Sequence, residues 1–117
     1  MEWCRTRPGA SEETPFGPGV IVYKVGGKIF AICDEGPHPA VSLKCDPRFA
    51  EYLRDRYKGA VTPGYHLNKR HWNTVSLDGR VPSDEVLEML GHSYTLVMRT
   101  LPRAVRQELD DSQLSGR

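Results

Sequence analysis

Side chains that could do chemistry are concentrated between Thr62 and Leu77, in the segment TPGYHLNKRHWNTVSL. It contains two histidines, an adjacent lysine and arginine, a tryptophan and two asparagines, and it has no acidic residue. Cationic side chains can contact phosphates, amides can hydrogen-bond to phosphates or base edges, and an aromatic ring can stack on an unpaired base. Together with one lysine from an earlier strand, the segment favours a nucleic-acid-binding surface formed by Lys44, His66, Asn68, Lys69, Arg70, His71, Trp72 and Asn73.

The same residues also have a purely structural explanation. His71, Trp72 and Asn73 could lock the loop onto a sheet, with the tryptophan packed beneath a helix, because large aromatic side chains in small domains are mostly buried. Lys69 and Arg70 are expected at an exposed loop tip, but exposure alone does not establish a function. The sequence leaves both explanations of Trp72 open.

The charge distribution decides where a polyanion could bind. The net charge of the chain is only +1, so its long-range attraction to polyanions is weak. Residues 44–80 contain eight basic and four acidic side chains, a local charge of +4 that leaves −3 for the rest of the chain. Any basic surface is therefore expected in this central part.

Metal binding and catalysis receive little support from the same residues. His66 and His71 have four residues between them, a loose spacing for zinc, and no second cysteine lies near Cys45. Pairing Cys45 with either histidine would give a nucleophile and a base, but no recognised nucleophile or oxyanion motif accompanies them. We expect no catalytic residue, no metal and no cofactor.

The length of 117 residues predicts one domain, here residues 1–109, followed by a polar, frayed tail at 110–117. Three widely spaced cysteines indicate reduced thiols and a reducing compartment. No apolar run approaches the roughly 20 residues of a membrane span, and the first seven residues lack the apolar region of a signal peptide. We expect a soluble, cytoplasmic protein without a membrane partner.

The elements that position these residues begin with a hairpin. The runs VIVYKV and KIFAIC are separated by Gly26-Gly27, which predicts a type I′ turn. The predicted pairs are Val25 with Lys28, Tyr23 with Phe30 and Ile21 with Ile32 on the core face, and Lys24 with Ile29, Val22 with Ala31 and Val20 with Cys33 on the other.

Alternation over residues 40–45 predicts a strand with Lys44 opposite the core, and residues 72–77 alternate again. A helix should begin at Asp46-Pro47 and end at Lys58-Gly59, and a longer helix should follow Pro82. A short further helix is expected over residues 103–109. The buried stripes are predicted to contain Phe49, Ala50, Leu53 and Tyr57 in the first helix, and Val86, Leu87, Leu90, Tyr94, Val97, Met98 and Leu101 in the second. The pattern predicts an α+β domain, an antiparallel sheet with helices packed on one side.

Several motifs resemble those of the MmcQ/YjbR-like family, over about residues 8–103. The matching residues are PGA…PFGPG (Pro8 to Gly19), VYKVGGKIFAI (Val22 to Ile32), LKCDP (Leu43 to Pro47), TPGYHLNKRHWNTV (Thr62 to Val75) and HSYTLV (His92 to Val97). The resemblance implies a CyaY-like fold, similar to the "double wing" DNA-binding domain of a phage transcription factor, and through that analogy a DNA-binding role. Frataxins share this fold and bind iron on an acidic ridge, but the first half of this chain has no comparable run of carboxylates.

The expected function is therefore that of a non-enzymatic DNA-binding protein using the Asn68–Asn73 loop, supported by Lys44 and by arginines of the preceding helix. The alternative is a protein-interaction or small-ligand module using the same loop. DNA binding requires Lys69, Arg70 and Lys44 to form one exposed basic face. A small-ligand module requires a closed pocket lined by Tyr65, His66 and Trp72.

Overall fold

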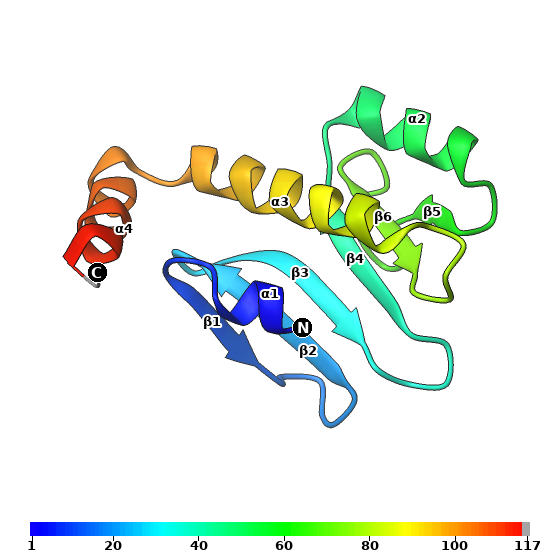
Figure 1. Ribbon diagram of the computed structural model, residues 1–117, viewed down its shortest axis with the longest axis horizontal. Coiled ribbons are helices and arrows are strands. Elements are labelled where there is room, and N and C mark those ends of the chain that lie inside the picture. Colours follow the sequence, from blue (N-terminus) through cyan, green and yellow to red (C-terminus); the bar gives the residue numbers. More distant parts are fainter. Residues whose placement is uncertain (116–117) are drawn as a thin grey trace.

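The computed structural model describes residues 1–115, with side chains for residues 1–110. Within that range it contains a six-stranded antiparallel sheet with helices on one side, which confirms the α+β prediction (Figure 1). The elements in chain order are α1 (Glu2–Arg5), β1 (Ala10–Glu13), β2 (Val20–Val25), β3 (Lys28–Asp34), β4 (Ala40–Lys44), α2 (Pro47–Arg56), β5 (Val61–Pro63), β6 (Trp72–Ser76), α3 (Ser83–Thr100) and α4 (Arg103–Ser115).

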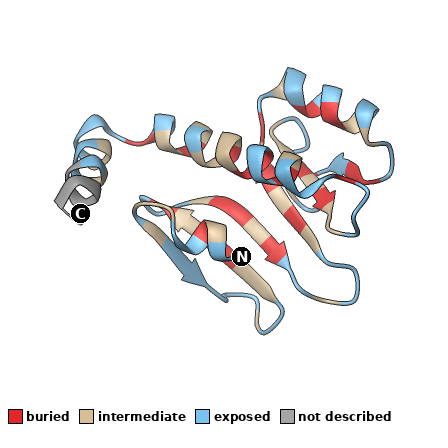
Figure 2. Ribbon diagram, viewed as in Figure 1, coloured by how far each residue is buried: buried red, intermediate tan, exposed pale blue. Residues whose placement is uncertain are grey.

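The strands lie in the order β1-β2-β3-β4-β6-β5. Helix α3 runs across the middle of the sheet and contacts β2, β3 and β4, whereas α2 contacts β5 and β6 at one end (Figure 1). The fully buried side chains of Phe30, Val41, Leu90 and Val97 belong to the core between the sheet and α3. Figure 2 shows that buried positions recur along the central strands and along α3. The opposite face of the sheet is termed the helix-free face.

The hairpin of β2 and β3 forms as predicted near its turn. Gly26 and Gly27 both have positive φ, 57° and 80°, and the pairs Val25–Lys28 and Lys24–Ile29 are confirmed. Beyond them a bulge shifts the register by one residue, because Phe30 is an extra residue in β3. The other four predicted pairs are therefore wrong, and the observed ones are Tyr23–Ala31, Val22–Ile32, Ile21–Cys33 and Val20–Asp34.

Helix α2 begins as expected: the Asp46 carboxylate accepts hydrogen bonds from the backbone N–H groups of Arg48 (3.0 Å) and Phe49 (3.4 Å). Ala50 and Leu53 are buried, but Phe49 is 36% exposed, so its assignment to the buried stripe is wrong. Because α2 packs only on the end of the sheet, one side of its apolar stripe faces the space between α2 and α3. Leu87, predicted in the stripe of α3, is likewise 44% exposed.

Helix α3 is tied to the sheet by a buried serine. Ser93 Oγ donates to the carbonyl of Phe30 (2.6 Å) and accepts from the N–H of Lys44 (2.9 Å). Helix α4 runs beyond the expected end at Leu109 to Ser115, and residues 116–117 of the predicted frayed tail lie outside the described residues. Over residues 1–115, the structure has no helix long and apolar enough to cross a membrane.

Candidate functional site

The segment rich in polar and aromatic residues forms the connection between β5 and β6. These strands are antiparallel, and the N–H of Gly64 donates to the carbonyl of Trp72 (2.8 Å) at the base of the connection. A Cβ atom added to Gly64 would lie 2.7 Å from Trp72 Cβ, so the close approach of the two chains requires glycine. The connecting residues 64–71 are termed the β5–β6 loop.

Arg54 of α2 holds this loop against the helix. Its Nε donates to Asn73 Oδ1 (2.7 Å), and its Nη2 donates to the carbonyls of Trp72 (3.2 Å) and Lys69. The helix arginine expected to support a ligand surface therefore supports the backbone of the loop. A loop whose backbone is already fixed loses less conformational entropy when it binds a partner.

Asn73 does not belong to the contact surface, and its assignment there is wrong. It is 2% exposed, and its amide also donates to the carbonyl of Ala50 (3.4 Å). The alternation along β6 contained the relevant signal. Asn73 shares a side of the strand with Val75, and that side faces the core.

The tip of the loop is exposed at Asn68, Lys69 and Arg70. Asn68 Oδ1 accepts from the N–H of Arg70 (3.0 Å), a local bond that shapes the turn. Lys69 Nζ donates to the carbonyl of Gly64 (3.2 Å). Neither Lys69 nor Arg70 forms a salt bridge with any described residue, so no carboxylate neutralises either charge.

Lys44 and Trp72 lie opposite each other on neighbouring strands. Both alternate with core residues, so both side chains are on the helix-free face, and both are half-buried. The orientation predicted for Lys44 is confirmed. Trp72 is therefore not packed beneath a helix. The purely structural explanation, which placed its ring there, is wrong on this point.

Two further aromatic rings of the loop lie beside one another. Tyr65 is 73% exposed, and its ring centroid lies 3.9 Å from that of His66. The N–H of Tyr65 donates to Thr74 Oγ1 (3.2 Å), which places this residue next to the helix-free face. His66 has a φ of 56°, an uncommon backbone conformation for a residue other than glycine.

His71 is half-buried at the end of the loop, and its carbonyl accepts from the N–H of Cys45 (2.7 Å). Burial, followed by the Asp46 carboxylate, raises the pKa of the Cys45 thiol to about 12. The thiol is therefore protonated at neutral pH and is a poor nucleophile. Among residues 1–110, no group of three or more His, Cys, Asp or Glu side chains is arranged to hold a metal ion.

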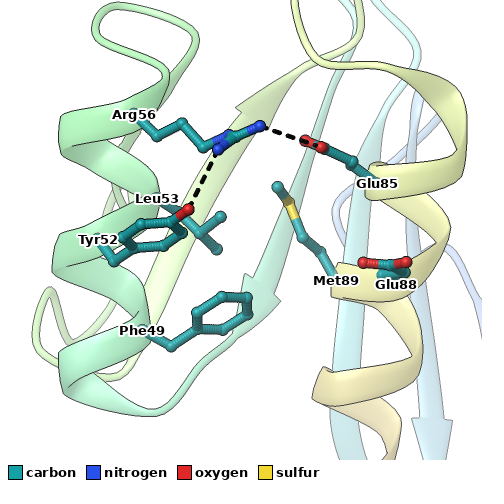
Figure 3. A pocket seen from close by; sticks show the side chains of 7 residues that line it. All are labelled: Phe49, Tyr52, Leu53, Arg56, Glu85, Glu88 and Met89. Atoms are coloured by element: carbon teal, nitrogen blue, oxygen red, sulfur yellow. Dashed lines mark hydrogen bonds and ion pairs between the residues drawn. The ribbon is translucent and has the colours of Figure 1, made fainter.

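The structure also contains a groove that the sequence interpretation missed. It lies between α2 and α3, has a volume of about 280 Å³ and is shown in Figure 3. Its lining residues are Phe49, Tyr52, Leu53, Arg56, Glu85, Glu88 and Met89. Tyr52 lies outside the apolar stripe of α2. A large aromatic residue at such a position is the sequence feature that could have indicated the groove.

Aromatic contacts organise the wall of the groove that α2 contributes. The rings of Phe49 and Tyr52 are stacked, 6.1 Å apart at 12°, and His92 of α3 meets Phe49 at 5.2 Å and 81°. His92 Nε2 accepts a hydrogen bond from the N–H of Asp46 (3.2 Å), which requires that nitrogen to be unprotonated. Burial lowers the pKa of His92, and this is consistent with the neutral form.

Other cavities are formed elsewhere by residues 1–110. One of about 260 Å³ lies beside Leu77 and Val86, one of about 340 Å³ lies between Trp3 and Leu109, and a much smaller one lies behind Leu43. None of these cavities, nor the α2–α3 groove, is lined by Tyr65, His66 or Trp72.

Comparison with known proteins agrees with this architecture. The chain is 36% identical to protein YjbR of Escherichia coli K12 over 110 residues, which are 93% of this chain and 92% of the relative. It is 34% identical to protein YbdF of Escherichia coli O157:H7 over 90 residues, 76% of this chain and 73% of that one.

Two solved structures are similar as well. A crystal structure of a Deinococcus radiodurans protein superimposes with a TM-score of 0.86 at 40% identity, covering 93% of this chain and 83% of that one. A Pseudomonas syringae protein, 22% identical, shares the fold with a TM-score of 0.71 over 83% of this chain and 94% of its own. The YjbR family pattern matches residues 5–96, and the chain belongs to the YjbR family.

Proposed function

We propose that this chain is a non-enzymatic, cytoplasmic DNA-binding protein whose contact surface is the β5–β6 loop together with the adjoining helix-free face. The observation that carries the proposal is the exposed Lys69–Arg70 pair. Its charges have no carboxylate partner among the described residues, and its backbone is held by Arg54.

Each part of this surface has a chemical role in the proposal. Lys69 and Arg70 contact phosphates, and Asn68 adds an amide. The side chains that extend the surface from the tip toward the sheet are Tyr65, His66, Trp72 and Lys44, and half-buried His71 lies at the end of the loop. Lys44 adds a cation, and the aromatic rings, exposed at Tyr65 and half-buried at Trp72, supply contacts to sugars or to bases.

Of the alternative, a protein-interaction or small-ligand module on the same loop, the small-ligand form receives less support. A small ligand requires a concave site that buries most of its surface. The α2–α3 groove and the other cavities described above are lined by other residues. An open, positively charged loop tip matches an extended polyanion better than a small enclosed ligand.

The experiment is a salt series of fluorescence anisotropy titrations with a labelled generic duplex. Wild type is compared with Lys69→Gln/Arg70→Gln, which removes the two tip charges. Each phosphate contact contributes about −0.9 to the slope of log affinity against log salt concentration. We expect the variant to bind more weakly, with a slope that is shallower by about 1 to 2.

The matched control is Arg99→Gln/Arg103→Gln, which removes the same charge from exposed positions on α3 and α4. It should keep the slope of the wild-type protein. Absence of duplex binding at low salt would overturn the proposal. Equal slopes for the two double variants would also overturn it, because attraction would then depend on net charge rather than on the loop.

A further inference from the structure

The α2–α3 groove already contains one guanidinium group. Arg56 Nη1 donates to the hydroxyl of Tyr52 (3.2 Å), and Arg56 Nη2 lies 3.5 Å from a Glu85 carboxylate oxygen. Figure 3 shows this arginine reaching from α2 across the groove to α3. One end of the groove therefore binds a planar cation between an aromatic residue and a carboxylate.

The rest of the groove is lined by a second carboxylate and by aromatic rings but, among residues 1–110, by no further arginine or lysine. Glu88 follows Glu85 by three residues on α3, so both side chains lie on the same side of the helix and line the groove. Among the described residues, Glu88 forms no salt bridge. The stacked rings of Phe49 and Tyr52 line the opposite wall and are 36% and 52% exposed.

The floor of the groove is apolar. Leu53 and Met89 line it and are each 5% exposed. A ligand can therefore pair its cation with the Glu88 carboxylate and stack the same cation on the exposed aromatic rings. Its apolar stem can then pack on Leu53 and Met89. Such contacts combine an ion pair, a cation–π interaction and apolar burial.

We propose that this groove is a docking site for an exposed arginine side chain of a protein partner. The choice of arginine follows from its planar guanidinium, which stacks on aromatic rings and bonds a carboxylate with two N–H groups, as an ammonium does not. The choice of a protein partner follows from the openness of the groove. Its aromatic wall is too exposed to enclose a free small ligand, whereas a partner surface covers the rim while one side chain fills the centre.

The test is a titration of ¹⁵N-labelled protein with the capped tripeptide acetyl-Leu-Arg-Leu-amide, followed by amide chemical shifts. We expect saturable shifts confined to residues 49–56 and 85–92. The matched peptide with citrulline in place of arginine keeps the shape and loses the charge, and it should bind about tenfold more weakly. Free arginine amide tests whether a small molecule can supply the guanidinium in place of a protein partner. It should bind more weakly than the tripeptide.

Two variants complete the experiment. Glu88→Gln should weaken binding of the arginine peptide to the level of the citrulline peptide. Glu51→Gln, the same change at an exposed position of α2 that does not line the groove, should leave binding unchanged. Equal binding of the arginine and citrulline peptides, unaltered binding by Glu88→Gln, or shifts outside the groove would overturn the proposal. Binding of arginine amide as tight as that of the tripeptide would replace the protein partner by a small-molecule ligand.

Discussion

Arg54 Nε lies 2.7 Å from Asn73 Oδ1, and this hydrogen bond joins helix α2 to strand β6 directly beneath the β5–β6 loop. Asn73 is 2% exposed, so the bond is shielded from water on the side of the asparagine. The same guanidinium bonds the carbonyl of Lys69 at the loop tip and that of Trp72 just after the loop. The geometry of the surface proposed to bind DNA therefore depends on one arginine that does not itself belong to that surface.

Replacing this arginine should loosen the loop and destabilise the protein. Arg54→Lys keeps the charge, but a single ammonium group cannot span acceptors that the guanidinium reaches with two separate nitrogens, so Asn73 Oδ1 or the Lys69 carbonyl loses its partner. We expect the free energy of unfolding to fall by about 2 kcal/mol, the cost of a buried acceptor left unpaired. Urea denaturation measures this change. Arg48→Lys, at an exposed position of the same helix, is the control, and an equally small effect of both changes would contradict this role of Arg54.

The close packing of the loop base predicts a second effect. Gly64→Ala would place a Cβ atom 2.7 Å from Trp72 Cβ and 3.2 Å from Leu67 Cβ, so the two strands must separate. We expect a loss of about 1 to 3 kcal/mol in unfolding free energy, the usual cost of overpacking. Weaker DNA binding should accompany it, because the loop tip would move.

Gly91→Ala makes the same chemical change inside α3, where the nearest atom belongs to Trp3 at 3.9 Å. That contact is an ordinary one, and alanine is a better helix former than glycine. The control should therefore be neutral or stabilising in thermal denaturation. A destabilisation by Gly91→Ala as large as that by Gly64→Ala would count against the steric explanation.

The pairing of His92 with Asp46 predicts a dependence of stability on pH. Burial lowers the pKa of His92 below its ordinary value of 6.5, so the unfolded chain binds the proton more tightly than the folded one. The contribution of the neutral histidine is thus fully present above pH 6.5. It is lost as the pH falls from that value through the lowered pKa of the folded state.

Urea midpoints at pH 7.5 and pH 5 test this dependence in wild type and in His92→Gln, whose side-chain oxygen can still accept from the Asp46 N–H. The decrease between the two pH values should be smaller in the variant. NMR titration of the His92 ring gives its pKa directly. A value at or above 6.5 in the folded protein would disprove the shift.

The sequence predicted the parts of the fold that depend on local chemistry. Gly26-Gly27 specified the turn, Asp46-Pro47 specified the start of α2, and alternation placed Lys44 on the helix-free face. Tertiary contacts decided the rest. The bulge at Phe30 has no signature within the two β-prone runs, and it changed the register of most of the hairpin.

The candidate site was likewise predicted where local chemistry decides it and missed where tertiary contacts do. Asn68, Lys69 and Arg70 are exposed because a polar loop tip has nothing to pack against. The alternation along β6 placed Asn73 on the core side, but the hydrogen bond to Arg54 that accounts for a buried amide there joins residues distant in sequence. The α2–α3 groove was missed because it forms between two helices whose spacing depends on how each packs on the sheet.

The most direct test of the central claim is to map the contact surface. Wild-type protein labelled with ¹⁵N is titrated at low salt with a short generic DNA duplex, and the shifted amide and indole signals are assigned. The proposal predicts shifts at residues 65–71, at the Trp72 indole and at Lys44, which weaken as salt is added. Shifts confined to the α2–α3 groove, or the absence of any saturable shift, would contradict it.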